Sequence, residues 1–449
     1  GDLDADGDGE LDQLPGCDVG DDLCDVISDI EGDDDQASND EEDVAGEIID
    51  GLHDGLEEDE IVLPPGFHYG QLARLVGSGL APRNVDAAGR GSALHNTLLV
   101  DALFDRQPLR QFELLVDEVS APQGTADAGV DERSAPEVGE FNVDADAAVF
   151  IDQQDDLLDL AKRDGVSAWV KGFGGNSRAD DSSILYNDYD LTAYGTSFGV
   201  DVALSETFQI GAYANYGDLN VNQRSGETGG GSWSPEGWGG GLTAQYSTRK
   251  FYVQGLLGAN EFSGEQSRNI LQINSVLGGN TARGDMSVTS YLGALRIGAP
   301  FKTGGMVLEP QGQLVWTQNH EQGFSETSGI EKNLRLKYKN RTTNFVETEL
   351  GIKLSVPIRT GERALLVPSL RAAWLADWNT NNEGQEIGYS FTKKTATFDS
   401  QLGIENGALL EAGLDYTVQN FNGVSVKLYG RGGMEFWASD RGTTWRASG

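Results

Sequence analysis

The sequence predicts an all-β transmembrane barrel of twelve antiparallel strands with a pore helix, preceded by an acidic N-terminal region that is partly helical or disordered. Three observations favour this fold: strands with strictly alternating faces, connections of alternating length, and charge concentrated at one end of the chain. The clearest strand, residues 345–356, reads FVETELGIKLSV, with apolar side chains on one face and charged ones on the other. Because successive side chains of a strand point to opposite faces, this pattern suits a wall between lipid and a wet interior.

The charge distribution divides the chain into two parts. Residues 1–165 contain 44 acidic and 8 basic side chains, a balance of −36, whereas residues 166–449 contain 28 and 24, a balance of −4. Phosphates need a basic footprint, so we expect no nucleic-acid partner. No run of about eighteen apolar residues is present, so no transmembrane helix is predicted. The chain begins within a motif and without Met, so we expect a fragment of a longer protein.

Residues 1–60 form the predicted calcium-binding and linker region. The opening GDLDADGDGELD spaces oxygen ligands as a calcium loop does, with Gly9 at the sharp turn and Glu10 offering its backbone carbonyl. The predicted metal ligands are Asp4, Asp6, Asp8, Glu10 and Asp12. Pro15 stands where an EF-hand has its bidentate glutamate, so the loop resembles the shorter repeats of thrombospondin type 3 modules. A solvated acidic run is the alternative reading.

The two cysteines of the chain lie in this acidic region. Cys17 and Cys24 predict a small disulfide loop in an oxidising compartment, with two unpaired thiols as the alternative. The remainder of residues 18–60 is acidic and poor in aromatic residues, so it cannot bury enough apolar surface to offset the entropy of ordering. We expect a disordered or calcium-ordered linker there.

Helical patterning follows in residues 61–146 and 147–165. Leucines recur at helical spacing between Leu94 and Val119, and Pro108 is expected to divide that stretch into two helices packed on each other or on the mouth of the barrel. Residues 147–163 begin with acids and end with Lys162 and Arg163, which complements a helix dipole. This last helix is either a surface helix or one threaded through the barrel lumen.

From Val166 the hydrophobic period changes to two. The predicted strands are 166–175, 190–204, 206–222, 233–248, 250–263, 286–300, 304–319, 341–357, 364–379, 407–419, 423–437 and one from about 443 to the end. Tight connections alternate with mostly long ones, as periplasmic turns alternate with extracellular loops in outer-membrane barrels. Aromatic residues near the strand ends are predicted to form the interfacial girdles: Trp233, Trp238, Tyr252, Phe301, Trp316, Phe345, Trp374, Trp378, Phe421 and Trp437.

Charged residues at inward positions of the strands predict a lumen lining of mixed sign. Its members are Glu347, Glu349, Lys353, Arg371, Glu411, Asp415, Lys427 and Arg431. Two readings stay open for this set. It is either a solvated wall or a set of contacts to a segment inside the pore.

Several strand motifs resemble one known family. The pieces are AWVKGFGG at 168–175, LTAYGTSFGVDVAL at 191–204, FQIGAYANYGDLNVN at 208–222, LVPSLRAAWLADW at 366–378 and ALLEAGLDYTVQNFNGVSVKLYGRGG at 408–433. In this order they are similar to the C-terminal translocator, or β-domain, of autotransporters. The resemblance covers residues 166–449 and implies a twelve-stranded barrel with a helix in its pore, for which we expect 147–163.

The resemblance also implies a function and its partners. It implies that the barrel sits in the outer-membrane lipid of a Gram-negative cell, that the barrel assembly machinery inserts it, and that it exports and anchors its own upstream passenger at the cell surface. Residues 61–146 would then be the passenger-to-barrel segment. Members of the family normally end on an aromatic residue, whereas this chain stops at Gly449. No Asn-Asn pair precedes the 147–163 helix, so we predict no self-cleavage.

Two other functions remain open at this point. A porin-like channel plugged by N-terminal helices would have the same wall, and a calcium-dependent surface-assembly or adhesin anchor would bind neighbouring surface proteins through the acidic head. We expect no enzyme. The four histidines are scattered, and no HExxH, paired CxxC, GxSxG or phosphate-loop motif occurs.

Overall fold

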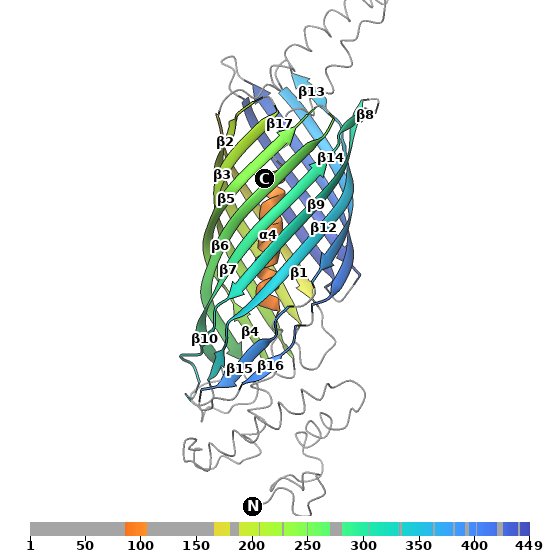
Figure 1. Cartoon of the computed structure of the whole chain (residues 1–449). Helices are drawn as coiled ribbons and strands as arrows, with labels where there is room; N and C mark the ends of the chain where they lie inside the picture. Colours follow the sequence, from red (N-terminus) through yellow and green to blue (C-terminus); the bar gives the residue numbers. More distant parts are fainter. Residues whose placement is uncertain are drawn as a thin grey trace, which may run out of the picture.

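A computed structural model describes residues 86–105 and 166–449 of the chain. Within the second range it leaves out 180–187, 206, 227–228, 249, 270–280, 304, 331, 333–334, 362–363, 380–381, 391–394, 401, 420–424 and 439–440. The described residues form a closed barrel of twelve antiparallel strands around one helix, α4 (Ala87–Phe104), which is drawn in orange in Figure 1. Among these residues no helix combines the length and the apolarity needed to span a membrane.

Each wall strand pairs with the next strand along the chain, and the last pairs with the first. The wall strands are β1 (Val166–Ala179), β2 (Tyr189–Ala203), β3 (Phe208–Gly226), β5 (Glu236–Ser247), β6 (Tyr252–Asn269), β7 (Thr281–Gly298), β9 (Met306–Glu321), β12 (Arg341–Ser355), β14 (Ala364–Trp378), β17 (Ile404–Gln419), β18 (Ser425–Trp437) and β19 (Thr443–Ser448). Closure runs from Phe173↔Ser448 to Ser177↔Thr444. The sheet therefore has no free lateral edge along this register, as a spanning sheet requires.

The two rims of the barrel differ, as the alternating connections predicted. One rim, here called the short-turn rim, carries connections such as residues 204–207 and 248–251 together with the short strands β8 (Phe301–Thr303) and β13 (Ile358–Gly361). The opposite long-loop rim carries β4 (Gly229–Trp233) and a separate four-stranded sheet of β10 (Phe324–Ser325), β11 (Leu336–Tyr338), β15 (Gln385–Tyr389) and β16 (Ala396–Phe398). In Figure 1 the short-turn rim is at the top and the long-loop rim at the bottom.

The twelve-strand prediction is confirmed, but several strands are longer than predicted toward the long-loop rim. β6 continues to Asn269 and β7 begins at Thr281, and these extensions pair with each other. Their outward side chains are polar, as in the 2.9 Å ion pair of Arg283 with Glu265. The alternation of apolar outward and polar inward residues ends where the lipid ends. A strand that continues into water therefore lacks this pattern and is not recognised from the sequence.

The wall is apolar outside and polar inside. On β12, Leu350 is 54% exposed and Ile352 is 51% exposed, whereas the neighbouring Glu349 and Lys353 are 2% and 7% exposed. Large apolar side chains on the outer face of other strands are equally open, such as Leu242 at 66% and Leu428 at 65%. A water-soluble protein does not leave so continuous an apolar surface exposed, so this face is the lipid contact.

The predicted aromatic girdle is only partly correct. Trp238, Phe301, Trp316, Trp374 and Trp378 are exposed on the outer face, and Phe421 lies outside the described residues. The prediction is wrong for Trp233, Tyr252, Phe345 and Trp437, which are buried inside the wall. The prediction failed because a residue near a strand end can point to either face of the wall, depending on its position in the alternation. Tyr252, for example, donates a 2.5 Å hydrogen bond to Glu309 in the interior.

The helix that the structure describes in the lumen is α4. A helix beginning at Leu94 was expected to pack on a second helix or on the barrel mouth, yet α4 begins at Ala87 and lies inside the barrel. The predicted pore helix, 147–163, lies outside the described residues. Fifteen of the 18 residues of α4 are buried, so the helix has no polar face to give it an amphipathic period. That absence explains why its role was not apparent from the pattern of the segment.

Candidate functional site

The contacts between α4 and the lumen wall form the candidate functional site. The helix runs along the barrel axis in Figure 1. Its first end lies at the long-loop rim, where Asp86 forms a 3.4 Å ion pair with Arg341 at the start of β12. Its last carbonyl, that of Phe104, accepts a 3.0 Å hydrogen bond from Gln254, three residues after the short turn before β6. The upstream chain therefore meets the helix at the long-loop rim.

The charges of α4 oppose its own dipole. Arg90 lies in its first turn, Asp101 lies in its last turn and Asp105 follows its end. Helix dipoles favour acids at the N-terminus and bases at the C-terminus, so each of these side chains destabilises an isolated helix. The wall must supply the compensating charge.

Four buried arginines, here called the arginine cluster, compensate the two aspartates. Asp101 forms 2.9 Å ion pairs with Arg296 and Arg446. Asp105 forms ion pairs of 2.7 Å with Arg296 and 2.8 Å with Arg431, and Arg371 stands 3.9 Å from both carboxylates. The four arginines come from β7, β14, β18 and β19. Removing one partner of a buried pair leaves an uncompensated charge, so these contacts hold the helix strongly.

Carboxylates of the wall strands also pair with the arginine cluster. Arg371 pairs with Glu349 at 3.0 Å and with Glu411 at 3.7 Å, Arg446 with Glu435 at 3.2 Å, and Arg431 with Asp415 at 3.1 Å. Arg296 differs from the other three. Its ion pairs are both with α4, and its wall contact is a 2.7 Å hydrogen bond to the neutral Gln313.

The predicted lumen residues all belong to the described part of the chain. Glu349, Arg371, Glu411, Asp415 and Arg431 lie in or beside the arginine cluster, as given above. Lys427 lies 3.4 Å from Asp415, Lys353 is buried on β12, and Glu347 lies farther toward the long-loop rim. Arg296 and Arg446 were not among the predicted residues, although both occupy inward positions of alternating strands. No local signal marks Asp101 and Asp105.

A chain of neutral polar contacts holds the middle of the helix. Asn96 donates to Ser290 at 2.8 Å and to Thr317 at 3.2 Å. Asn260 in turn donates to the Asn96 side-chain oxygen at 2.7 Å and accepts from Asn215 at 2.9 Å. Because the buried amide of Asn96 meets partners on three wall strands, these bonds fix the depth and rotation of α4.

An aromatic clamp lies beside this chain. His95 is wholly buried, with its ring centroid 5.1 Å from that of Phe173 and 4.9 Å from that of Phe262, both edge to face. Gly217 on β3 faces the same imidazole, and a Cβ atom at that position would overlap its Nε2. The glycine thus makes room for the only bulky ring of the helix centre.

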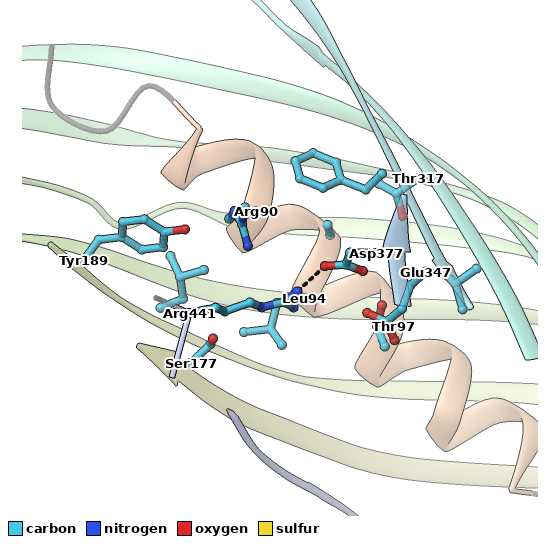
Figure 2. A pocket seen from close by; sticks show the side chains of 13 residues that line it. Arg90, Leu94, Thr97, Ser177, Tyr189, Thr317, Glu347, Asp377 and Arg441 are labelled. Carbon is cyan, nitrogen blue, oxygen red and sulfur yellow. Dashed lines mark hydrogen bonds and ion pairs between the residues drawn. The ribbon is translucent and has the colours of Figure 1, made fainter. Parts of the chain in front are cut away.

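A second charged group holds the end of α4 at the long-loop rim. Arg90 pairs with Glu405 at 2.8 Å, and Arg441 lies 3.5 Å from the same carboxylate. Arg441 also pairs with Asp377, which Figure 2 shows as a dashed line. Glu347 and Asp377 face each other across β12 and β14, and both line a cavity between α4 and the wall. That cavity measures about 20 Å³, room for roughly one water molecule, so the helix fills the lumen at this level.

The predicted N-terminal sites are not among these residues. The calcium ligands Asp4, Asp6, Asp8, Glu10 and Asp12 lie outside the described residues, as do Cys17 and Cys24. Within the described ranges, no group of three His, Cys, Asp or Glu side chains is arranged to hold a metal ion.

Comparison with known proteins relates the barrel to a family. A model of the autotransporter β-domain matches residues 168–430, which are more than half of the 449 residues. No curated protein matches the chain. Among solved structures, the translocator domain of NalP from Neisseria meningitidis is 15% identical at a TM-score of 0.47, with 68% of this chain and 95% of that chain covered.

Two further structures are similar to the barrel. The β-domain of the Bordetella autotransporter BrkA is 18% identical at a TM-score of 0.45, with 64% and 98% covered. The transport unit of AIDA-I from Escherichia coli is 15% identical at a TM-score of 0.42, with 64% and 89% covered.

Proposed function

The chain belongs to the autotransporter β-domain family, and from that premise we propose that α4 is the anchor by which the barrel holds its exported passenger at the cell surface. The barrel lies in the Gram-negative outer membrane, where it exports and anchors an N-terminal passenger. One observation carries the proposal. The helix that joins the upstream region to the barrel is fixed in the lumen by ion pairs at both of its ends.

The direction of α4 supports a surface location for the residues before it. Asp86 lies at the long-loop rim, and long loops of outer-membrane barrels are extracellular. Residues 1–85 therefore continue outward from the cell in this proposal. The test is protease treatment of intact cells with an epitope placed before Gly1. We expect the epitope to be digested while a periplasmic marker survives, and protection of both would contradict the proposal.

The same helix closes the pore. Side chains from every level of α4 contact the wall, and the described cavity beside it has room for about one water molecule. We expect the intact protein to show little conductance in planar bilayers and a variant lacking 87–104 to conduct. Deleting 147–163 instead tests the rival porin-like channel, in which that segment is the plug. A large conductance of the intact protein would favour the channel.

The barrel assembly machinery is the proposed partner for insertion. Strands with apolar-out alternation cannot close in water without exposing their lipid face, so a membrane-resident assembly factor is expected to assist them. Depleting that machinery in a Gram-negative host should leave the protein unfolded and degraded in the periplasm. Normal levels of folded, heat-modifiable barrel after depletion would contradict this partner.

The acidic head is proposed to bind calcium through Asp4, Asp6, Asp8, Glu10 and Asp12. Carboxylates alternating with small residues are hard oxygen ligands suited to this ion. Calorimetry of the purified protein should show calcium binding that is lost on changing Asp4, Asp6 and Asp8 to Asn. The variant Asp33→Asn, whose carboxylate lies outside the loop, is the matched control. If a chelator also disperses surface assemblies of intact cells, the head binds neighbouring surface proteins, and indifference would count against that role.

A further inference from the structure

We propose that the arginine cluster, before it receives Asp101 and Asp105, binds the acidic side chains of the passenger in transit, so that the barrel exports an acidic polypeptide faster than a neutral one. This inference rests on the proposed export function and names the class of substrate that the lumen favours. It assigns the cluster a role during export, in addition to holding the helix afterwards.

Arg296 is the first reason. With α4 in place it is only 3% exposed, and its two ion pairs are with Asp101 and Asp105. When the helix is not yet in place, the guanidinium keeps its hydrogen bond to Gln313 but has no carboxylate at these contacts. Without the helix the guanidinium faces the lumen, and an acidic side chain that reaches this position is stabilised by a charge-assisted hydrogen bond to it.

The placement of the cluster is the second reason. Its four arginines lie on strands β7, β14, β18 and β19, within a continuous run of seven of the twelve wall strands that also includes β9, β12 and β17. Asp101 and Asp105 each contact arginines from more than one of these strands. A polypeptide that occupies the lumen at this level therefore passes within reach of several guanidinium groups at once. Several weak sites that share a ligand allow it to enter and also to leave.

The composition of the upstream chain is the third reason. Residues 1–85 contain 26 acidic and 2 basic side chains, and the first basic residue is Arg74. All 26 acidic side chains lie within residues 2–60, so this part of the passenger presents carboxylates to the cluster repeatedly during its passage. The wall carboxylates Glu349, Glu411, Asp415 and Glu435 already pair with Arg371, Arg431 or Arg446, so they offer no matching site for a basic passenger.

The same ion pairing explains why α4 remains in the lumen at the end of export. Asp101 lies in the last turn of α4 and Asp105 directly follows the helix, four residues further along the chain. The middle of the helix supplies further contacts that a passing chain lacks, through Asn96 and His95. The cluster therefore exchanges one carboxylate for the next until the helix fits the lumen and stays.

The test follows export of the full chain, carrying a signal peptide and an epitope before Gly1, by the time at which the epitope becomes protease-accessible on intact cells. The native passenger is compared with one in which Asp33, Asp34, Asp35, Glu41, Glu42 and Asp43 are changed to Asn or Gln. These positions lie outside the predicted calcium loop. Each passenger is combined with the native barrel, with Arg296→Gln and with Arg283→Gln, an exposed arginine on the same strand.

We expect Arg296→Gln to slow export of the acidic passenger by about fivefold and to leave the neutral one unchanged, a coupling within the range of interacting groups. Arg283→Gln should change neither rate. With the native barrel, the neutral passenger should be slower than the acidic one, and this comparison stands even if Arg296→Gln fails to assemble. Equal rates for the two passengers, or an equal slowing of both by Arg296→Gln, would overturn the proposal. If no variant exposes its epitope although the barrel is folded in the membrane, the proposed export function is wrong, and the inference about the arginine cluster is wrong as well.

Discussion

The Arg296 guanidinium on β7 lies 2.7 Å from the carboxylate of Asp105, which directly follows α4, and this ion pair joins the end of the helix to the wall. Both side chains are 3% exposed. We expect Arg296→Gln to destabilise helix retention by about 3 kcal/mol, because the two aspartates keep only part of their compensation. Limited proteolysis within α4 measures the released fraction. Arg283→Gln, whose exposed pair is worth about 0.2–1 kcal/mol, is the control.

The space beside Gly217 gives a second prediction. A larger side chain there overlaps the His95 ring, so Gly217→Val should expel or shift the helix while the barrel wall itself still forms. Overpacking of this kind costs about 1–3 kcal/mol. The readout is conductance in planar bilayers, which should rise. Adding His95→Ala should restore the low conductance. If it does not, the effect of Gly217→Val does not come from its overlap with the helix.

The ion pair at the other end of α4 can be measured by a double-mutant cycle. Arg90→Gln and Glu405→Gln each remove one partner of a 2.8 Å contact that is about 11–13% exposed. We expect a coupling energy of about 0.5–3 kcal/mol between them for retention of the helix. The partly open position places the value toward the lower end of that range. Strict additivity of the two single variants would show that this contact does not hold the helix.

The lipid-facing surface makes a fourth prediction. Leu350 is 54% exposed on β12 and its inward neighbours are charged. Leu350→Arg should cost about 2–4 kcal/mol for folding into lipid vesicles if the residue lies near the middle of the bilayer. Leu350→Ala, which keeps the face apolar, should cost much less. The measurement is the denaturant midpoint of the folded barrel in vesicles, and equal costs for both variants would place this face away from lipid.

The four-stranded sheet at the long-loop rim gives a prediction about pH. The Lys339 ammonium hydrogen-bonds to Glu386 and thereby lowers the pKa of that carboxyl. The pair is therefore present at neutral pH and is lost only when the pH falls below the usual range for a glutamate. NMR titration of Glu386 should show the low pKa, and Lys339→Met should raise it toward about 4.3. The same pKa in both proteins would mean that the contact is not made in solution.

The sequence was informative wherever the physics is local. The alternation of residues 345–356 identified the lipid face at Leu350 and the lumen face at Glu349, because a strand with lipid on one side and polar groups on the other repeats every two residues. The alternating connections predicted the two rims. Arg371 and Arg431, two of the charges predicted to point inward, contact Asp105 in the lumen. The polar ends of β6 and β7 were missed because they lie beyond the apolar band.

The sequence by itself therefore determined the wall of this protein: its strand number, its apolar outside and its charged inside. Only the tertiary structure decided that residues 87–104 fill the lumen and that Arg296 receives Asp101 and Asp105. A helix enclosed on all sides has no polar face, so its period does not reveal its partner. An ion pair between residues 191 positions apart depends on how the barrel closes, and no short stretch of the chain contains that information.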